Sequence, residues 1–221
     1  MTASDWNNYD ELLFAARKYG NISDPLNYDA TEKIGAGYGM VKYTYGRWEL
    51  IGGVRVEHTN QGYTLKFPTE SADPKGNQKY TDVLPSFHAK YGVHENANLR
   101  LSYARSINRP SFFEIVPYSI INEDYKEKGN PDLKHTVADN VDFRYEFFPK
   151  SSEQFMIGAF YKYLKDPIEY GLLNEGQDTY YKPMNFGNAT NLGLEVDIMK
   201  YFNWFGIKAN YTYTHSKITT E

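Results

Sequence analysis

Two short segments of the chain alternate between polar and apolar residues. The first covers residues 98–105 and the second covers residues 140–147. Successive side chains of a β-strand point to opposite faces of the sheet, so a period of two predicts a strand with one apolar and one polar face. In both segments the apolar face carries mainly Leu, Tyr, Val and Phe, and the polar face carries mainly Arg, Ser, Asp, Asn and Glu.

The same period recurs along the chain and predicts about eight strands in four hairpins. The predicted strands cover residues 32–45, 48–57, 81–93, 98–106, 140–148, 154–164, 191–200 and 205–217. Short turns near positions 46, 95, 150 and 203 join the strands of each hairpin, and long connections at about 59–80, 106–138 and 164–188 join successive hairpins. We therefore predict an all-β, antiparallel up-and-down meander with the four short turns at one end.

The alternation of short turns and long connections is typical of outer-membrane β-barrels, which have short periplasmic turns and longer extracellular loops. A soluble sandwich usually has short connections throughout. Charges of both signs occur on the polar face of nearly every predicted strand, as expected for the wet interior of a wide barrel. The pattern favours part of a transmembrane β-barrel, and the alternative is a secreted or surface β-sandwich that binds glycans or protein.

Composition alone does not decide between these two folds. Aromatic residues make up 17% of the 221 residues, and 21 of them are Tyr. Tyr suits a membrane interface, where an apolar ring and a polar tip meet different solvents, and it equally suits a sugar-binding surface. A run of about 18 apolar residues, which a transmembrane helix would need, does not occur.

If the chain is a barrel wall, its apolar strand faces should meet lipid. Slipping the register of a strand by one residue would move every side chain to the other face, so the assignment is strongly determined. The residues predicted on the lipid side are Leu99, Leu101, Tyr103, Val141, Phe143, Tyr145, Ile207, Ala209 and Tyr211. The residues predicted on the opposite side are Arg100, Ser102, Asp142, Arg144, Lys208 and Asn210.

Several functional classes find no support in the sequence. The net charge is -4 with no basic stripe, which argues against nucleic-acid binding. Cys is absent, so disulfides and thiolate metal sites are impossible. The five His residues are scattered, and no nucleophile-base or paired-carboxylate arrangement can be assigned. We expect no cofactor and no metal site, and we do not expect an enzyme.

Several motifs in the middle of the chain resemble one barrel family. Residues 102–111 read SYARSINRPS, Pro117 follows, and residues 129–134 read GNPDLK. Together with Leu84-Pro85-Ser86 and the segment GVRVE at 53–57, they resemble the barrel of TonB-dependent outer-membrane receptors, most closely the form common in Bacteroidetes. One departure is His135, which follows Lys134 where the family usually has Pro-Glu, and this puts any role of that Glu in doubt.

The resemblance implies a bacterial outer-membrane receptor that takes up a scarce nutrient, with energy from the TonB system. The family's plug domain and terminal aromatic strand are not found, and family barrels have 22 strands. We therefore expect a fragment: residues 1–30 as an extracellular loop segment, 31–217 as a partial barrel of four hairpins, and 218–221 as the start of a further loop. Its partners would be outer-membrane lipid, the TonB system through the missing plug, and a nutrient that the sequence does not identify.

Candidate site residues lie in the long connection before residue 138. Tyr118, Asn122, Glu123, Asp124 and Tyr125 are the candidates for ligand contact, although a solvated mixed-charge loop is the competing interpretation. A second group, Arg109, Pro110, Gly129, Asn130 and Pro131, is predicted to shape the loop roots. Pro fixes φ and keeps the preceding residue extended, and Asn favours turns that its own side chain closes.

Overall fold

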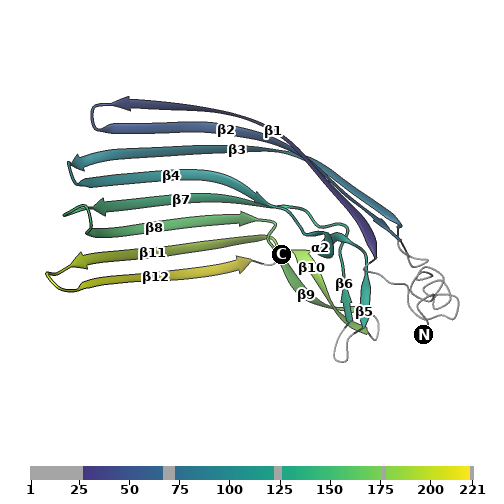
Figure 1. The fold of residues 1–221 in the computed structure, drawn as a ribbon. Coiled ribbons are helices and arrows are strands. Elements are labelled where there is room, and N and C mark those ends of the chain that lie inside the picture. Colours follow the sequence, from purple (N-terminus) through teal and green to yellow (C-terminus); the bar gives the residue numbers. More distant parts are fainter. Residues whose placement is uncertain (1–26, 67–72, 122–125, 176–177, 220–221) are drawn as a thin grey trace, which may run out of the picture.

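The computed structural model describes residues 27–66, 73–121, 126–175 and 178–219, which form two sheets (Figure 1). The large sheet has eight strands in the order β1-β2-β3-β4-β7-β8-β11-β12, all antiparallel. Their bounds are β1 Tyr28–Tyr45, β2 Trp48–Leu65, β3 Lys75–His94, β4 Ala97–Asn108, β7 Thr136–Phe147, β8 Gln154–Lys165, β11 Asn188–Tyr201 and β12 Gly206–Thr219. Among the described residues, no helix is long and apolar enough to cross a membrane.

The order of the eight strands confirms the predicted meander. Each strand pairs with the one before and the one after it among the eight, and the short turns of all four hairpins lie at the same end (Figure 1). A sandwich would divide these eight strands between two sheets packed face to face, whereas here all eight belong to one continuous sheet, so the sandwich alternative is wrong. In the described part of the chain, the sheet is open, with β1 and β12 as its edges.

The pairing register also confirms the predicted division of side chains between the two faces. Phe143 lies opposite Leu101 on β4 and Ala159 on β8, and the row continues to Leu194 and Tyr213. Residues directly opposite each other in antiparallel strands share a face. We call the side that carries this row the apolar face.

The opposite side is the charged face. Arg144 lies opposite Arg100 on β4 and Gly158 on β8, and Gly158 lies opposite Glu195 on β11. Arg100 forms an ion pair with Glu146 over 2.7 Å, and Arg144 forms one with Glu195 over 3.7 Å. The like charges of Arg100 and Arg144 are therefore each compensated by a carboxylate on the same face.

The first three strands are much longer than the other five. β1, β2 and β3 have 18, 18 and 20 residues, and the remaining strands of the large sheet have 12 to 14. We call β1–β3 the tall wall and β4, β7, β8, β11 and β12 the low wall. The expectation of a loop at 59–80 is wrong, because β2 continues to Leu65 and β3 begins at Lys75.

The connections predicted at 106–138 and 164–188 are not structureless either. They contain helix α2 (Phe112–Ile115) and a four-stranded sheet of β5 (Ser119–Ile121), β6 (Lys126–Lys128), β10 (Asp178–Asn185) and β9 (Ile168–Glu175). We call this unit, residues 109–135 and 166–187 as far as they are described, the cap. It lies at the end of the large sheet opposite the short turns (Figure 1).

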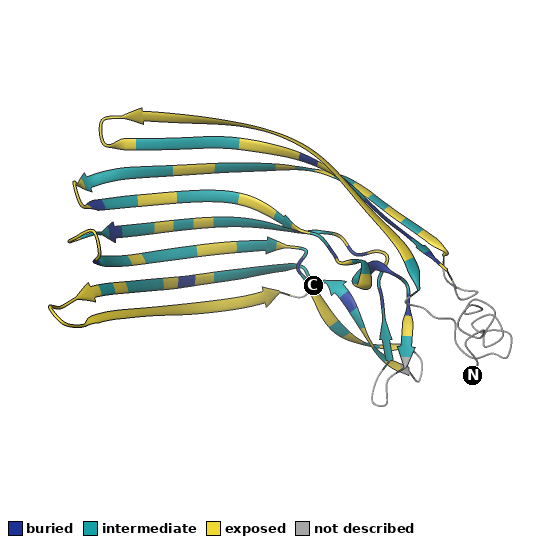
Figure 2. Cartoon of the chain, viewed as in Figure 1, coloured by how far each residue is buried: buried dark blue, intermediate teal, exposed yellow. Residues whose placement is uncertain are grey.

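A small apolar core joins the cap to the tall wall. Tyr63 and Leu65 of β2 pack with Ile115, Val116 and Leu133 of the cap, and all five are buried (Figure 2). On β2 these two residues share the charged face with Glu57, Thr59 and Gln61, which are also buried. The cap therefore covers the charged face of the tall wall and leaves the apolar face open.

Candidate ligand-binding cap

Arg109 and Pro110 fasten the start of the cap to the tall wall. The Arg109 guanidinium donates to the Thr59 hydroxyl over 3.1 and 3.2 Å and forms an ion pair with the Glu57 carboxylate. Pro110 is fully buried, and its carbonyl accepts a hydrogen bond from the Gln61 side chain over 2.9 Å. Thr59 and Gln61 lie in the segment predicted as loop, which explains why the sequence did not reveal these contacts.

Helix α2 is one turn long and begins with a capping box. The Ser111 hydroxyl accepts from the Glu114 backbone N–H over 3.3 Å, and the Glu114 carboxylate accepts from the Ser111 backbone N–H over 2.6 Å. Two backbone donors at the helix start are thereby satisfied by side chains. The spacing of Ser111 and Glu114 is visible in the sequence and could have predicted this helix.

Gly129 and Asn130 shape the return of the chain toward the large sheet. A Cβ atom at Gly129 would lie 1.8 Å from the backbone oxygen of Val116, so no other residue fits without moving the backbone. The Asn130 backbone N–H donates to the Glu114 carbonyl over 2.7 Å, and its side-chain amide donates to the Pro183 carbonyl over 2.9 Å. Asn130 thus ties the α2 segment to strand β10.

Three side chains of β3 hold the segment that follows. The Gln78 side-chain amide donates to the carbonyls of Pro131 and Leu133 over 2.8 and 3.0 Å. Asp82 lies 2.9 Å from Nε2 of His135, and the His135 ring stacks on Tyr80 with 4.1 Å between ring centroids. His135, at which the sequence departs from the resemblance described above, therefore takes part in this attachment.

Tyr118 lies in the interior of the cap. Only 2% of its surface is exposed, its hydroxyl donates to Glu127 over 2.5 Å, and its ring lies 4.7 Å from that of Phe113. Burial raises the pKa of the Tyr118 phenol, and the hydrogen bond to Glu127 raises it further. Burial likewise raises the pKa of Tyr170, which is hydrogen-bonded to Tyr118. Both phenols therefore stay neutral and act as hydrogen-bonding groups.

The hairpin β9–β10 presents aromatic and apolar side chains to the outside. Leu172 lies opposite Tyr181 and Tyr170 lies opposite Pro183, so these four share one face. Leu172, Tyr170 and Tyr181 are 57%, 45% and 38% exposed. Aromatic side chains with a polar tip suit ligands that combine apolar and hydrogen-bonding groups.

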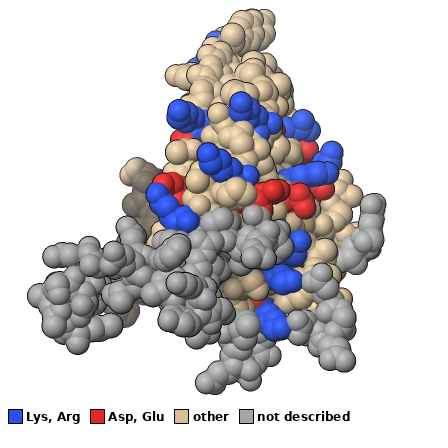
Figure 3. All heavy atoms as spheres, turned by 90° about the vertical axis from the view of Figure 1, so that its right-hand side faces the viewer, with Lys and Arg blue, Asp and Glu red and all other residues tan. Residues whose placement is uncertain are grey.

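The other face of the same small sheet is basic and aromatic. Lys128 of β6 lies over the Tyr180 ring, 4.2 Å from its centroid. Lys126 lies opposite Tyr180 in the pairing of β6 with β10. Lys182, two residues after Tyr180 on β10, lies on the same face as Tyr180. Figure 3 shows the molecule from the end that carries the cap, where basic and acidic side chains lie close together.

The predicted ligand residues are only partly described. Asn122, Glu123, Asp124 and Tyr125 lie outside the described residues, and Tyr118 is placed inside the cap. Their contact with ligand stays a prediction. The sequence analysis missed Tyr170, Leu172 and Tyr181, although the segments 168–175 and 178–185 both carry apolar residues typical of strands.

A concave surface, separate from the cap, lies on the charged face of the large sheet. A hollow of about 470 Å³ is lined by residues of β2, β3, β4 and β7, namely Glu49, Ile51, His88, Ala89, Lys90, Arg100, Leu101, Ser102, Asp142 and Arg144. In the described part of the chain, no cluster of His, Asp or Glu could hold a metal ion. The surface is suited to contacts with a polar partner that carries both signs of charge.

The fold is shared with transporters and receptors of known structure. The copper transporter OprC matches with a TM-score of 0.68 at 16% identity, over 86% of this chain and 30% of its own. The hemophore receptor HasR of Serratia marcescens gives 0.68 at 13% identity, over 83% and 34%. The siderophore receptor PirA of Pseudomonas aeruginosa gives 0.61 at 14% identity, over 87% and 44%.

These likenesses concern the fold, and the chain spans less than half the length of each of the three proteins. No curated protein sequence matches the chain. The sequence model of one family, however, matches residues 4–221, almost the whole chain. The eight-stranded meander, its apolar outer face and this match lead to one conclusion: the chain belongs to the outer membrane protein beta-barrel family, and its place is the bacterial outer membrane.

Proposed function

We propose that the chain is part of a TonB-dependent outer-membrane receptor that takes up a scarce nutrient. In this proposal the large sheet is an arc of the barrel wall and the cap contributes to the extracellular binding site. The short turns face the periplasm, and the cap faces outside, as is usual for such barrels. A plug domain and the TonB system would supply gating and energy from outside this chain.

One observation carries the proposal: the long connections are folded into a cap that is fixed to the charged face of the wall. Side-chain hydrogen bonds of Gln61, Gln78 and Arg109 join the cap to the wall, and one from Asn130 joins two segments of the cap. A prearranged surface at the barrel mouth is what selective capture of a nutrient requires, because less ordering is needed on binding.

The candidate nutrients are iron chelates, vitamins, glycans and peptides. The similar structures are described as a copper transporter, a siderophore receptor and a hemophore receptor. Their identity to this chain is at most 16%, so their ligands support uptake in general and not one ligand. The exposed Tyr170, Leu172 and Tyr181 suit a ligand with apolar or ring-shaped parts.

Growth experiments test this function. Cells that carry the complete receptor would be supplied with single limiting nutrients: a ferric chelate, cobalamin, an oligosaccharide or a peptide mixture. We expect the receptor to permit growth on one of them, and we expect inactivation of TonB to abolish that growth. A triple variant Tyr170→Ser, Leu172→Ser and Tyr181→Ser should require much more nutrient for the same growth.

The control carries changes on the exposed apolar face of β12, Tyr211→Leu and Tyr213→Leu, which keep the lipid contact. This control should grow like the wild type. Receptor in the outer membrane that supports no TonB-dependent growth on any nutrient would contradict the proposal.

A further inference from the structure

The apolar face is bounded at both ends by polar or charged residues. On β11 the residues of this face between Thr190 and Lys200 are all apolar: Leu192, Leu194, Val196 and Ile198. Ten residues span about 34 Å along a strand, or ~24 Å along the membrane normal at a tilt of about 45°. The apolar band of outer-membrane barrels is about 25 Å tall, so this stretch matches the hydrocarbon layer.

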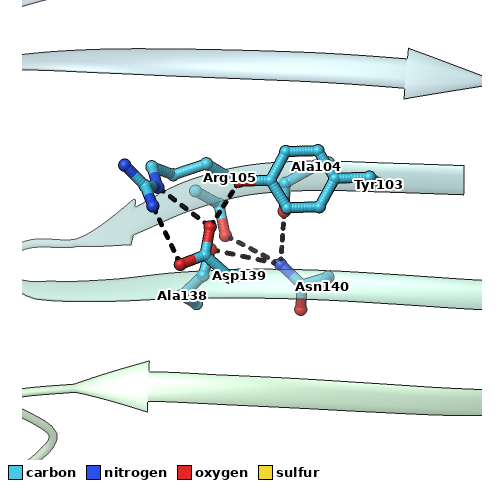
Figure 4. A network of polar contacts seen from close by, with 7 residues as sticks. Tyr103, Ala104, Arg105, Ala138, Asp139 and Asn140 are labelled. Atoms are coloured by element: carbon cyan, nitrogen blue, oxygen red, sulfur yellow. Dashed lines mark hydrogen bonds and ion pairs between the residues drawn. The ribbon is translucent and has the colours of Figure 1, made fainter.

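An ion pair marks the same boundary on the neighbouring strands at the extracellular end. Arg105 of β4 donates to both carboxylate oxygens of Asp139 on β7, over 2.9 and 3.0 Å, and the Tyr103 hydroxyl donates to Asp139 over 2.7 Å (Figure 4). Through Tyr163 on β8, this row continues in register to Thr190 on β11. The row thus lies at the level where the hydrocarbon ends.

Two exposed lysines stand at this boundary on the apolar face. Lys217 of β12 lies opposite Thr190, and Lys165 of β8 lies opposite Asn188. Unlike Arg105, neither lysine forms an ion pair with a residue that the structure describes. Two strand spacings and two residues separate their Cα atoms, about 12 Å, so both long side chains can reach one anion between them.

The surface next to Lys165 is hollowed on the side of the tall wall. A hollow of about 530 Å³ lies where pairing between β3 and β4 has ended, and Lys79, Lys134 and Lys165 contribute to its lining. The acidic residues in this lining are Asp132 and Asp166, and His135 is paired with Asp82. Lysines thus border the boundary row on both sides of β8.

We propose that Lys165 and Lys217, with the Asn188 amide and the Thr190 hydroxyl between them, bind the phosphate headgroup of an outer-leaflet lipid. Its acyl chains would lie along Leu192, Leu194 and Val196, directly below on the same face. The site is continuous with the lipid-facing surface, and its charge is complementary to a phosphate. It does not depend on which nutrient the receptor takes up.

The test compares lysines on opposite faces of the same two strands. Lys162 of β8 and Lys208 of β12 are exposed on the charged face, and they serve as matched controls for Lys165 and Lys217. The complete receptor, in phosphatidylcholine nanodiscs, would be titrated with bisphosphorylated lipid A, and binding would be followed by native mass spectrometry. Heat-modifiable mobility on gels would confirm that each variant is folded.

We expect Lys165→Gln to weaken binding about fivefold and the double variant with Lys217→Gln about thirtyfold. The control double variant, Lys162→Gln with Lys208→Gln, should bind lipid A like the wild type. Dephosphorylated lipid A should bind the wild type as weakly as lipid A binds the double variant Lys165→Gln with Lys217→Gln. Equal losses in the two double variants would overturn the proposal. So would displacement of lipid A by an equal concentration of inorganic phosphate, which would identify a site for a free anion.

Discussion

The tall wall and the low wall have the same apolar face but end in different ways. On the low wall, β4 and β7 continue only three residues beyond Arg105 and Asp139, which mark the end of the apolar band. On β2 of the tall wall, the apolar face ends at Val56, and the strand continues for nine residues to Leu65. In the membrane placement inferred above, those nine residues lie outside the hydrocarbon layer.

The difference shows that two kinds of burial stabilise one sheet. In the low wall the apolar face is covered by lipid and the charged face is balanced by ion pairs such as Arg100 with Glu146. In the outer part of the tall wall it is the other face that is covered, by Ile115, Val116 and Leu133 of the cap. The length of the strands beyond the membrane therefore depends on the cap. A substitution that loosens the cap should destabilise the tall wall and leave the low wall unchanged.

The largest effect is expected where a charge enters the apolar band. Phe143→Arg in the complete receptor puts a guanidinium at about mid-depth of the low wall, at a cost of about 2–4 kcal/mol. Arg144→Ala removes a charge from the opposite face and should cost far less. Heat-modifiable mobility of the membrane fraction measures assembly, and we expect folded protein to be reduced only by Phe143→Arg. Equal assembly of both variants would show that this face does not meet lipid.

A smaller effect is expected where the cap meets the tall wall. Arg109→Met removes the hydrogen bonds to Thr59 and leaves Glu57, whose side chain is 8% exposed, with one cationic partner fewer. Loss of hydrogen bonds to a charged group costs about 1.5–3 kcal/mol. Hydrogen exchange should accelerate roughly 10- to 100-fold in residues 109–121 and 59–65, and not in β8 or β11.

The matched control is Arg47→Met. Arg47 lies in the turn between β1 and β2 and donates to the Val93 carbonyl over 3.0 Å, at the far end of the same wall. The Arg47→Met variant should leave hydrogen exchange in the cap unchanged. Faster exchange throughout the sheet after Arg109→Met would contradict a local joint between cap and tall wall.

The same comparison explains what the sequence could and could not predict. Within the membrane, lipid on one side and water on the other impose a strict period of two, so residues 99–103 and 141–145 could be assigned to faces correctly. From residue 57 to residue 61, β2 is polar on both faces: His58 and Asn60 face outward, and Thr59 and Gln61 are buried under the cap. Without that contrast the period is lost, and the segment was predicted as a loop.

The cap itself depends on contacts between distant segments. Asn130 donates to Pro183, 53 residues later, and Gln78 donates to Pro131, also 53 residues away. Turn residues such as Gly129 and Pro131 predict where the chain bends but not which segment it meets. The capping box at Ser111 and Glu114 is local and could have been found. The pairing of β6 with β10 could not, because it is a parallel contact between two separate connections.

A more local effect is expected at the turn before Asn130. Gly129→Ala places a methyl group against the Val116 carbonyl, since the Cβ would lie only 1.8 Å from that oxygen. Forcing a methyl group into packed structure costs about 1–3 kcal/mol. Limited proteolysis should cut residues 109–135 sooner while the barrel remains heat-modifiable. Gly37→Ala on β1 is the control, because nothing lies within 4 Å of its Cβ position. If the cap of the Gly129→Ala variant were also cut at the wild-type rate, the close packing at this turn would be contradicted.

The smallest effect should appear at the short-turn end of the low wall, where Glu153 joins the turn between β7 and β8 to β11. Its carboxylate lies 2.6 Å from Lys200 Nζ, and 1% of its side chain is exposed. The hydrogen bond from Lys200 holds the pKa of Glu153 below its ordinary value of 4.5. Because the folded-state pKa is lowered, the stabilising effect is fully present above pH 4.5 and is lost as the pH falls through the folded-state value.

Glu153→Gln should therefore narrow the difference in Tm between pH 7 and pH 3, measured by circular dichroism on the complete receptor. The control is Glu95→Gln in the exposed turn between β3 and β4, which should leave the difference in Tm as in the wild type. If Glu95→Gln narrowed the difference in Tm by the same amount, the acid sensitivity would not be specific to the Glu153–Lys200 pair.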